Sequence, residues 1–303
     1  MAGSAVKPPD AGASAGAKAS AIAAAPAGAR GADAGGGGMA LAAYTLWHRE
    51  LVRFFRQRNR VVGALATPLV FWVLLGSGLS GSFVLPTNGG AAADAQVKYL
   101  EYFFPGTVVL ILLFTAIFAT ITVIEDRREG FLQGVLVSPA PRLAIALGKI
   151  LGGATIATIQ GVLFLLLWPF VGHWPGVGHM LAALVIMFVL AVGLNGLGLC
   201  IAWPMDSTAA FHAIMNLFLM PMWFLCGAVF PVKSAPIWMR VVMYANPLTY
   251  GQALFSEALT GGRTGAAAPA PMWVSAVVTL AFTVGIVLLA ARLVSRPRKD
   301  GLP

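Results

Sequence analysis

The sequence predicts an all-α polytopic membrane protein with six transmembrane helices. Of its 303 residues, 58% are hydrophobic and only 10% are charged, whereas soluble domains carry about 25% charged residues. Several apolar runs reach the roughly 20 residues that a helix needs to cross about 30 Å of hydrocarbon. The alternating pattern of a membrane barrel does not occur in the sequence. Because the spans take up most of the length, we expect one membrane domain and no separate catalytic domain.

Residues 1–39 consist almost wholly of Ala, Gly, Ser and Pro. A segment of this composition has too little apolar surface to bury for folding. It also lacks the continuous apolar region of a cleaved signal peptide. We therefore expect a disordered cytoplasmic tail, then a membrane domain over residues 40–299 and a C-terminal end at 300–303.

The pattern of residues 41–60 predicts an amphipathic helix. One stripe is rich in aromatic side chains, and arginines follow the opposite stripe: Tyr44, Trp47, Leu51, Phe54 and Phe55 against Arg49, Arg53, Arg56 and Arg60. Such a helix lies on the membrane surface, with its arginines toward anionic lipid or a partner protein. It serves either as a basic anchor that fixes topology or as a direct contact with a partner subunit.

Six apolar segments follow, each long enough to cross a bilayer: about 61–79, 102–124, 143–171, 180–203, 209–230 and 272–293. Small residues in the third span, Gly148, Gly152 and Gly153, predict close helix packing. Ionisable groups are nearly absent from the spans, which disfavours a transporter driven by an ion gradient. The polar groups there serve either interhelical hydrogen bonds or a substrate pathway: chiefly Asn195, His212 and Asn216.

A charged connection separates the second and third spans. Seven charged side chains fall within residues 125–149: Glu125, Asp126, Arg127, Arg128, Glu129, Arg142 and Lys149. Phe131 and Leu132 give the connection an apolar face that needs a partner or the bilayer, and Ser138–Pro139 ends its helix. The segment is either a solvated connection or the place where something outside the bilayer pushes on the spans.

Residues 231–259 are amphipathic and are broken at Asn246–Pro247. The segment is too short and too polar to cross the bilayer twice. It predicts a re-entrant or interfacial helical hairpin on the outer side, between spans five and six. Trp238 and Tyr250 would lie at headgroup level.

The distribution of Lys and Arg predicts that both termini are cytoplasmic. Leaving the tail aside, thirteen basic residues fall on the side of the termini: Arg49, Arg53, Arg56, Arg58, Arg60, Arg127, Arg128, Arg142, Lys149, Arg292, Arg296, Arg298 and Lys299. Four fall on the other side: Lys98, Lys233, Arg240 and Arg263. This bias follows the positive-inside rule. The net charge of +9 therefore reflects topology and does not indicate nucleic-acid binding.

The sequence contains neither of the motifs GxxxxGK[ST] and HExxH, and Cys200 and Cys226 lack metal-ligand spacing. We therefore predict no catalytic residue, no cofactor site and no metal site in this chain. An intramembrane enzyme would need convergent acid, base or metal ligands, which the spans do not offer. The driving force for any transport would have to come from another protein.

Two stretches resemble a known family. They are the run from Glu125 through Gly130–Phe131 and Ser138–Pro139 to Gln160–Gly161, and the run Met220–Pro231 followed by Asn246–Tyr250. Both are similar to permease subunits of ABC-2 type exporters, in the branch of daunorubicin-resistance and nodulation exporters. The resemblance covers about residues 40–299.

The resemblance implies a division of labour among the segments. A coupling helix, residues 125–139, would dock on a separately encoded ATP-binding subunit through residues Glu125 to Leu132, Ser138, Pro139 and Arg142. The amphipathic helix would be the connecting helix, with Trp47, Arg49, Arg53, Phe54, Arg56 and Arg60. The outer re-entrant segment would include Gly227, Phe230, Pro231, Trp238, Asn246, Pro247 and Tyr250.

We thus expect a non-enzymatic permease in a bacterial cytoplasmic (inner) membrane. Two copies, identical or different, would pair within membrane lipid, and ATP and Mg²⁺ would bind only to the partner subunit. The apolar pathway favours export of an amphipathic drug-like or lipid-like substrate. Export of a polysaccharide or lipid-linked oligosaccharide is the first alternative, and a non-transporting membrane scaffold is the second.

Overall fold

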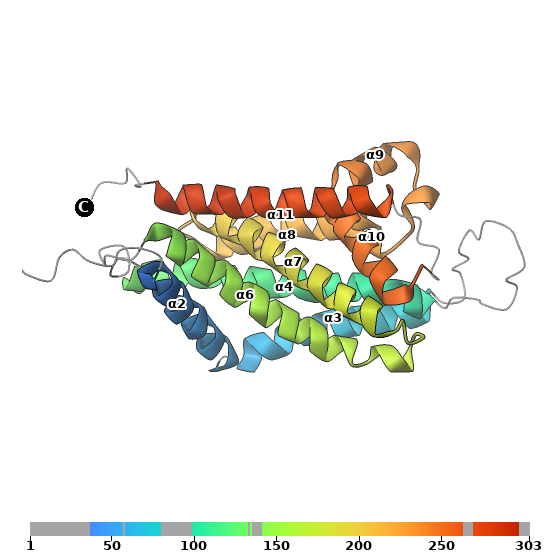
Figure 1. Ribbon diagram of the computed structural model, residues 1–303, viewed down its shortest axis with the longest axis horizontal. Helices are drawn as coiled ribbons and strands as arrows, with labels where there is room; N and C mark the ends of the chain where they lie inside the picture. The colour runs from blue at the N-terminus through green and yellow to red at the C-terminus, as the bar shows by residue number, and fades with distance from the viewer. Residues whose placement is uncertain are drawn as a thin grey trace, which may run out of the picture. The chain divides into compact units, whose positions relative to one another are not determined.

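The computed structural model describes residues 37–56, 58–79, 99–132, 134, 141–262 and 269–296. Nearly all of the predicted tail and all of residues 300–303 lie outside these ranges. Residues 39–303 form one structural unit, and every regular element in its described part is a helix (Figure 1). The predicted all-α class is confirmed.

Nine α-helices are described in this unit. Their bounds are α2, Gly37–Arg56; α3, Arg58–Gly78; α4, Tyr99–Arg128; α6, Arg142–Leu165; α7, Val177–Ala202; α8, Thr208–Trp223; α9, Ile237–Ala245; α10, Pro247–Thr260; and α11, Met272–Ser295. Short 3₁₀ turns lie at Trp168–Phe170 and Val232–Ser234, and a π-helical turn, Phe224–Ala228, continues α8.

Within the described residues, five helical segments are long and apolar enough to cross a membrane: Tyr99–Arg128, Arg142–Phe170, Val177–Ala202, Thr208–Ala228 and Met272–Ser295. They overlap five of the six predicted spans. The first span was predicted over 61–79, where the strongly apolar part of α3 covers only Leu65–Gly78. The sixth crossing therefore stays a prediction.

Helix α4 is the centre of the unit. Its residues from Tyr102 to Leu113 are all buried, and α3, α6, α7, α8 and α10 pack around it (Figure 1). Its sequence is apolar on every side, which is the pattern of a helix enclosed by other helices. By contrast, α11 buries only one stripe: Ser275, Thr279, Thr283, Ala290 and Val294.

The end of α4 corrects one predicted boundary. Residues 125–128 form the last turn of α4, whereas the sequence placed them at the start of a separate coupling helix. Helix α4 stops because Gly130 adopts a left-handed conformation with φ 76°, which glycine allows at the end of a helix. Ser138 and Pro139 lie outside the described residues.

Helix α2 also ends earlier than predicted, at Arg56, and Arg60 belongs to α3. Two glycines of α6 allow α2 to pack closely against it. A Cβ atom at Gly148 would lie 2.7 Å from the Leu46 Cβ, and one at Gly152 would lie 2.8 Å from the Glu50 Cβ. This close approach brings Glu50 beside Lys149, the residue that follows Gly148.

Candidate functional site

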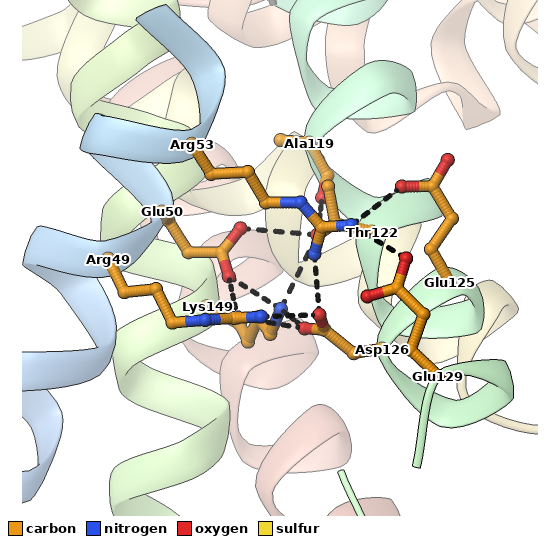
Figure 2. A network of polar contacts seen from close by, with 9 residues as sticks. All are labelled: Arg49, Glu50, Arg53, Ala119, Thr122, Glu125, Asp126, Glu129 and Lys149. Atoms are coloured by element: carbon orange, nitrogen blue, oxygen red, sulfur yellow. Dashed lines mark hydrogen bonds and ion pairs between the residues drawn. The ribbon is translucent and has the colours of Figure 1, made fainter. Parts of the chain in front are cut away.

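A network of charged side chains joins the last turn of α4 to α2 and α6 (Figure 2). Helix α2 supplies Arg49, Glu50 and Arg53, α4 supplies Thr122, Glu125 and Asp126, and α6 supplies Lys149. Arg49 and Arg53 are four residues apart, as are Thr122 and Asp126, so each pair shares one face of its helix. The network therefore lies where these two faces meet α6.

Asp126 is the centre of the network, and its side chain is 0% exposed. Arg49 binds both of its oxygens, with Nη2 at 2.7 Å from Oδ1 and Nη1 at 3.1 Å from Oδ2. Arg53 donates to Oδ1 and Lys149 donates to Oδ2. Three cations from two helices thus share one buried carboxylate.

Lys149 and Glu50 form a second buried ion pair. Their side chains are each 5% exposed, and the Lys149 Nζ lies 2.6 Å from the Glu50 Oε1. The Thr122 hydroxyl donates to the other Glu50 oxygen at 3.2 Å. Every charge in this pair is therefore compensated by a neighbour on another helix, as buried charges require.

The positive and negative charges within the network are equal in number. Three cations, Arg49, Arg53 and Lys149, match three anions, Glu50, Glu125 and Asp126. Removing Glu50, Asp126 or Lys149, which are the buried members, leaves an uncompensated buried charge, which is strongly destabilising. The arrangement holds the ends of α2, α4 and α6 together.

The Arg49 guanidinium is anchored on two sides. It lies 3.7 Å above the centre of the Phe131 ring, a cation–π contact. Burial lowers the pKa of Arg49, but the hydrogen bonds and charge of Asp126 outweigh burial and raise this pKa above its ordinary value. Arg49 therefore stays charged and holds Phe131, which the sequence assigned to the coupling helix, against α2.

Beside the network lies an open groove of about 620 Å³. It is lined by His48, Arg49, Val52, Arg53, Arg56 and Glu129. The Glu129 side chain is 63% exposed and lies 3.9 Å from the Arg53 Nη2. Glu129 therefore presents its carboxylate to the groove, in contrast to Asp126, which is enclosed.

The remaining arginines of the predicted coupling contact are bound within the chain. Arg127 donates to the carbonyl oxygens of Trp203 and Met205, and Arg128 donates to that of Asp206 at 3.0 Å. Arg142 donates to the Ser295 carbonyl oxygen at 3.1 Å.

The side chains predicted for the connecting helix differ in burial. Phe54 is buried, Trp47 is half-buried and donates to the Thr155 hydroxyl at 3.0 Å, and Arg56 is exposed. The sequence placed Trp47 with the aromatic residues at the headgroup boundary. The structure instead gives it a hydrogen-bonded position against α6.

At the other end of α4, tyrosines support the π-helical turn. Gly227 has φ 86°, and its carbonyl oxygen accepts a hydrogen bond of 2.7 Å from the Tyr102 hydroxyl. Tyr99 donates to the Val229 carbonyl oxygen at 2.9 Å. A π turn leaves some regular helical hydrogen bonds unmade. The two tyrosine hydroxyls supply hydrogen bonds to carbonyl oxygens of this region in their place.

The break predicted at Asn246–Pro247 separates α9 from α10. The Asn246 side chain caps α10 by accepting from the Leu248 N–H at 3.0 Å, and it donates to the Met222 carbonyl oxygen at 2.6 Å. Pro247 takes the first helical position, which suits its fixed backbone angle. Three other residues predicted for this segment are placed differently: Pro231 is buried, Phe230 is half-buried and Trp238 is 66% exposed.

The predicted pathway groups do not gather at one place. Asn195 is fully buried and donates to the Ala191 carbonyl oxygen of its own helix at 2.8 Å. His212 is half-buried with its ring edge-on to Phe118 and Phe211. Asn216 is exposed on α8. Among the described residues, no group of His, Cys, Asp or Glu is placed to hold a metal ion.

Sequence reasoning missed Glu50, Thr122 and Lys149 as members of the network. Glu50 carried a usable signal, because it is the one acidic residue among five arginines in residues 41–60. The sequence places Lys149 in the charged connection and in the topological charge bias, but not in a buried ion pair, although it stands between Gly148 and Gly152. Thr122 gave no signal, since threonine is common in membrane spans.

Comparisons with known proteins point to one family. A family model described as ABC-2 type transporter matches residues 42–260. Similar proteins include nodulation protein J of Sinorhizobium fredii, 26% identical over 258 residues, which are 82% of this chain and 93% of that protein. The daunorubicin resistance ABC transporter permease protein DrrB1 of Streptomyces coeruleorubidus is 24% identical over 222 residues, 71% of this chain and 74% of that protein.

A third similar protein is the probable multidrug ABC transporter permease YbhR of Escherichia coli. It is 26% identical over 158 residues, 52% of this chain. The match spans less than half of YbhR, 43% of its length.

Proposed function

The chain belongs to the ABC-2 type transporter family, and from that premise we propose that it is the permease of an ATP-driven exporter. Membership and its apolar helices make it a multi-pass membrane protein and a transport subunit. The family pairs such permeases with an ATP-binding subunit, as expected for a chain in which no ATP-binding motif was found. We propose that ATP and Mg²⁺ bind to that separately encoded subunit.

The contrast between Asp126 and Glu129 carries the proposal. Asp126 is enclosed and paired, while Glu129, three residues later, is 63% exposed at the groove. A partner would therefore meet Glu129, the half-buried Phe131 and the α2 arginines, and the network behind them would keep α2, α4 and α6 together. Closure of two ATP-binding subunits would then favour one permease conformation over another through differential binding.

Topology and assembly extend the proposal. The groove and the last turn of α4 would face the cytoplasm, with both termini on that side of a bacterial inner membrane. Helix α3 would complete six spans, and α9 and α10 would form an outer re-entrant hairpin. A second permease copy would complete the pathway within the lipid bilayer.

We propose an amphipathic drug-like or lipid-like substrate. The spans are nearly free of ionisable groups, which suits an apolar cargo. Two similar proteins carry the words multidrug and daunorubicin resistance in their names. Polysaccharide or lipid-linked oligosaccharide export is the alternative that the substrate titration below separates.

Reconstitution with a copurified ATP-binding subunit tests the proposal. We expect ATP hydrolysis in proteoliposomes to rise with a drug or lipid and not with a lipid-linked sugar. Reversing Glu129 and truncating Phe131, Glu129→Lys with Phe131→Ala, should abolish this stimulation while membrane insertion is kept. The matched control, Lys233→Glu with Val241→Ala, makes similar changes at exposed positions near α9 and should respond like the wild type.

Two outcomes would contradict the proposal. Failure of any ATP-binding subunit to copurify with the wild-type chain would favour a membrane scaffold. Full stimulation in the Glu129 and Phe131 variant would show that the partner docks elsewhere.

A further inference from the structure

Arg127, in the last turn of α4, and Arg142, at the start of α6, are each bound to the carboxyl end of another helix. Arg127 donates to the carbonyl oxygens of Trp203, at 2.6 Å, and Met205, at 2.9 Å, just past the end of α7. Arg142, the first residue of α6, donates to the carbonyl oxygen of Ser295, the last residue of α11. Carbonyls at helix ends lack intrahelical partners and carry negative partial charge, so they suit a guanidinium.

The contacts of Arg127 are specific. Its Nη1 also pairs with the Asp206 carboxylate at 3.1 Å, and its guanidinium lies 5.5 Å from the Trp203 ring. The side chain is only 19% exposed. Arg127 is thus engaged by the turn between α7 and α8 and has little surface left for a partner subunit.

Helices α7 and α11, which the two arginines reach, are packed tightly against each other. A Cβ atom at Gly193 would lie 2.9 Å from the Thr283 Oγ1, and one at Gly196 would lie 2.9 Å from the Ile286 Cγ2. The Thr283 hydroxyl donates across the interface to the Val189 carbonyl oxygen at 3.4 Å. Because close-packed interiors transmit strain, we expect the two helices to shift together.

Helix α10 connects the pair of α7 and α11 to the π-helical turn. Helix α10 packs on both α7 and α11, and a Cβ atom at Gly251 would clash with the Leu190 Cδ2. The N-terminal end of α10 contacts the turn and the helix before it. The capping residue Asn246 donates to the Met222 carbonyl oxygen at the end of α8, and the Thr249 hydroxyl donates to the Leu225 carbonyl oxygen within the turn. A π turn is a place where a helix bends.

We propose that Arg127 and Arg142 are positioning residues that link the ends of α4 and α6 to the π-helical turn through α7 and α11. The resemblance assigned both arginines to partner contact, but their hydrogen bonds lie within the chain. Displacement at the coupling helix would move α7 and α11 as one body and carry α10 with them. The inference rests on the proposed function, because the displacement comes from a bound ATP-binding subunit.

Hydrogen exchange on the whole complex tests this link. The full chain with its copurified ATP-binding subunit is placed in lipid nanodiscs, and amide exchange of residues 224–235 is compared with and without Mg·ATP. We expect ATP to change this exchange in the wild type. In Arg127→Gln with Arg142→Gln, the ATP-dependent change should fall about tenfold or more, since each lost bond involves a charged donor.

Two further variants serve as controls. Arg292→Gln removes a charge from the exposed side of the last turn of α11, where the described residues give that side chain no ion pair, and it should respond like the wild type. Arg127→Lys with Arg142→Lys keeps the charges but loses the guanidinium fork. This pair should show an intermediate response, and it replaces the glutamine pair if the latter fails to accumulate.

The outcomes separate the inference from the function on which it rests. A wild-type exchange response in the glutamine pair, or in the lysine pair where that replaces it, would overturn the inference and leave the proposed function intact. Loss of the ATP-binding subunit from the variant complex would also overturn it, because the arginines would then be partner contacts. If the wild-type complex itself fails to form, the proposed function fails and the inference fails with it.

Discussion

Arg49 of α2 donates hydrogen bonds to both carboxylate oxygens of Asp126 of α4, at 2.7 and 3.1 Å. The two residues are 77 positions apart in the chain, and Asp126 is completely buried. Paired hydrogen bonds of this kind fix the orientation of both side chains as well as their distance. The pair therefore sets how the amphipathic helix lies against the helix that ends at the groove.

Neutralising Asp126 should disrupt the charge network and lower the stability of the protein. In Asp126→Asn, Arg49, Arg53 and Lys149 lose their shared anion, and we expect the free energy of unfolding to fall by about 3 kcal/mol. Unfolding in mixed micelles with a rising fraction of SDS measures the loss. Asp206→Asn, at a carboxylate that is 69% exposed, should cost less than about 1 kcal/mol. Equal losses in the two variants would contradict the central position of Asp126.

Glu50 and Lys149 should behave as an energetically coupled pair. Glu50→Gln or Lys149→Met alone leaves one buried charge without its partner, whereas the double variant removes both. The double variant should therefore be more stable than the sum of the single effects predicts, by about 1–3 kcal/mol. A double-mutant cycle of unfolding free energies gives this number directly. Additive effects would mean that the two side chains act independently.

Gly148→Leu should push α2 away from α6. The new Cβ would meet Leu46 at 2.7 Å and the Ala43 carbonyl oxygen at 3.0 Å, and such overpacking costs about 1–3 kcal/mol. We expect lower stability and weaker ATPase stimulation. Gly285→Leu, where no atom lies within 4 Å of the added Cβ, is the matched control. A Gly148 variant with normal stimulation would show that close packing of α2 is not needed for coupling.

Tyr102→Phe should weaken the π-helical turn. It leaves the Gly227 carbonyl oxygen without the hydrogen bond from the Tyr102 hydroxyl, which should cost about 1–3 kcal/mol of unfolding free energy. Tyr250→Phe removes an exposed hydrogen bond to the Tyr244 carbonyl oxygen and should cost much less. The same micelle titration compares the two variants, and a larger effect at Tyr250 would contradict the role of Tyr102.

The sequence predicts the helical class because the apolar runs of a membrane protein must satisfy their own backbone hydrogen bonds. It also predicts the close-packing role of Gly148 and Gly152, since small residues at this spacing mark a helix contact. It places the break at Asn246–Pro247, where the chemistry is local. These features depend on residues that are near one another in the chain.

The charge network was not predictable in the same way. Arg49, Asp126 and Lys149 are far apart in sequence, and each had a sufficient local explanation as lipid contact, partner contact or topological charge. Asp126 and Glu129 are neighbouring carboxylates with different surroundings: Asp126 lies in the last turn of α4 and faces α2 and α6, whereas Glu129 directly follows the end of the helix. That difference depends on packing, which a single sequence does not display.

Site-specific photocrosslinking from the groove tests the docking site most directly. With a photoreactive phenylalanine at Val52, which lines the groove, we expect a crosslink to the copurified ATP-binding subunit. The same probe at Val241, which is 63% exposed on α9, should give none. A bound ATP-binding subunit that crosslinks from Val241 and not from Val52 would contradict the docking site proposed here.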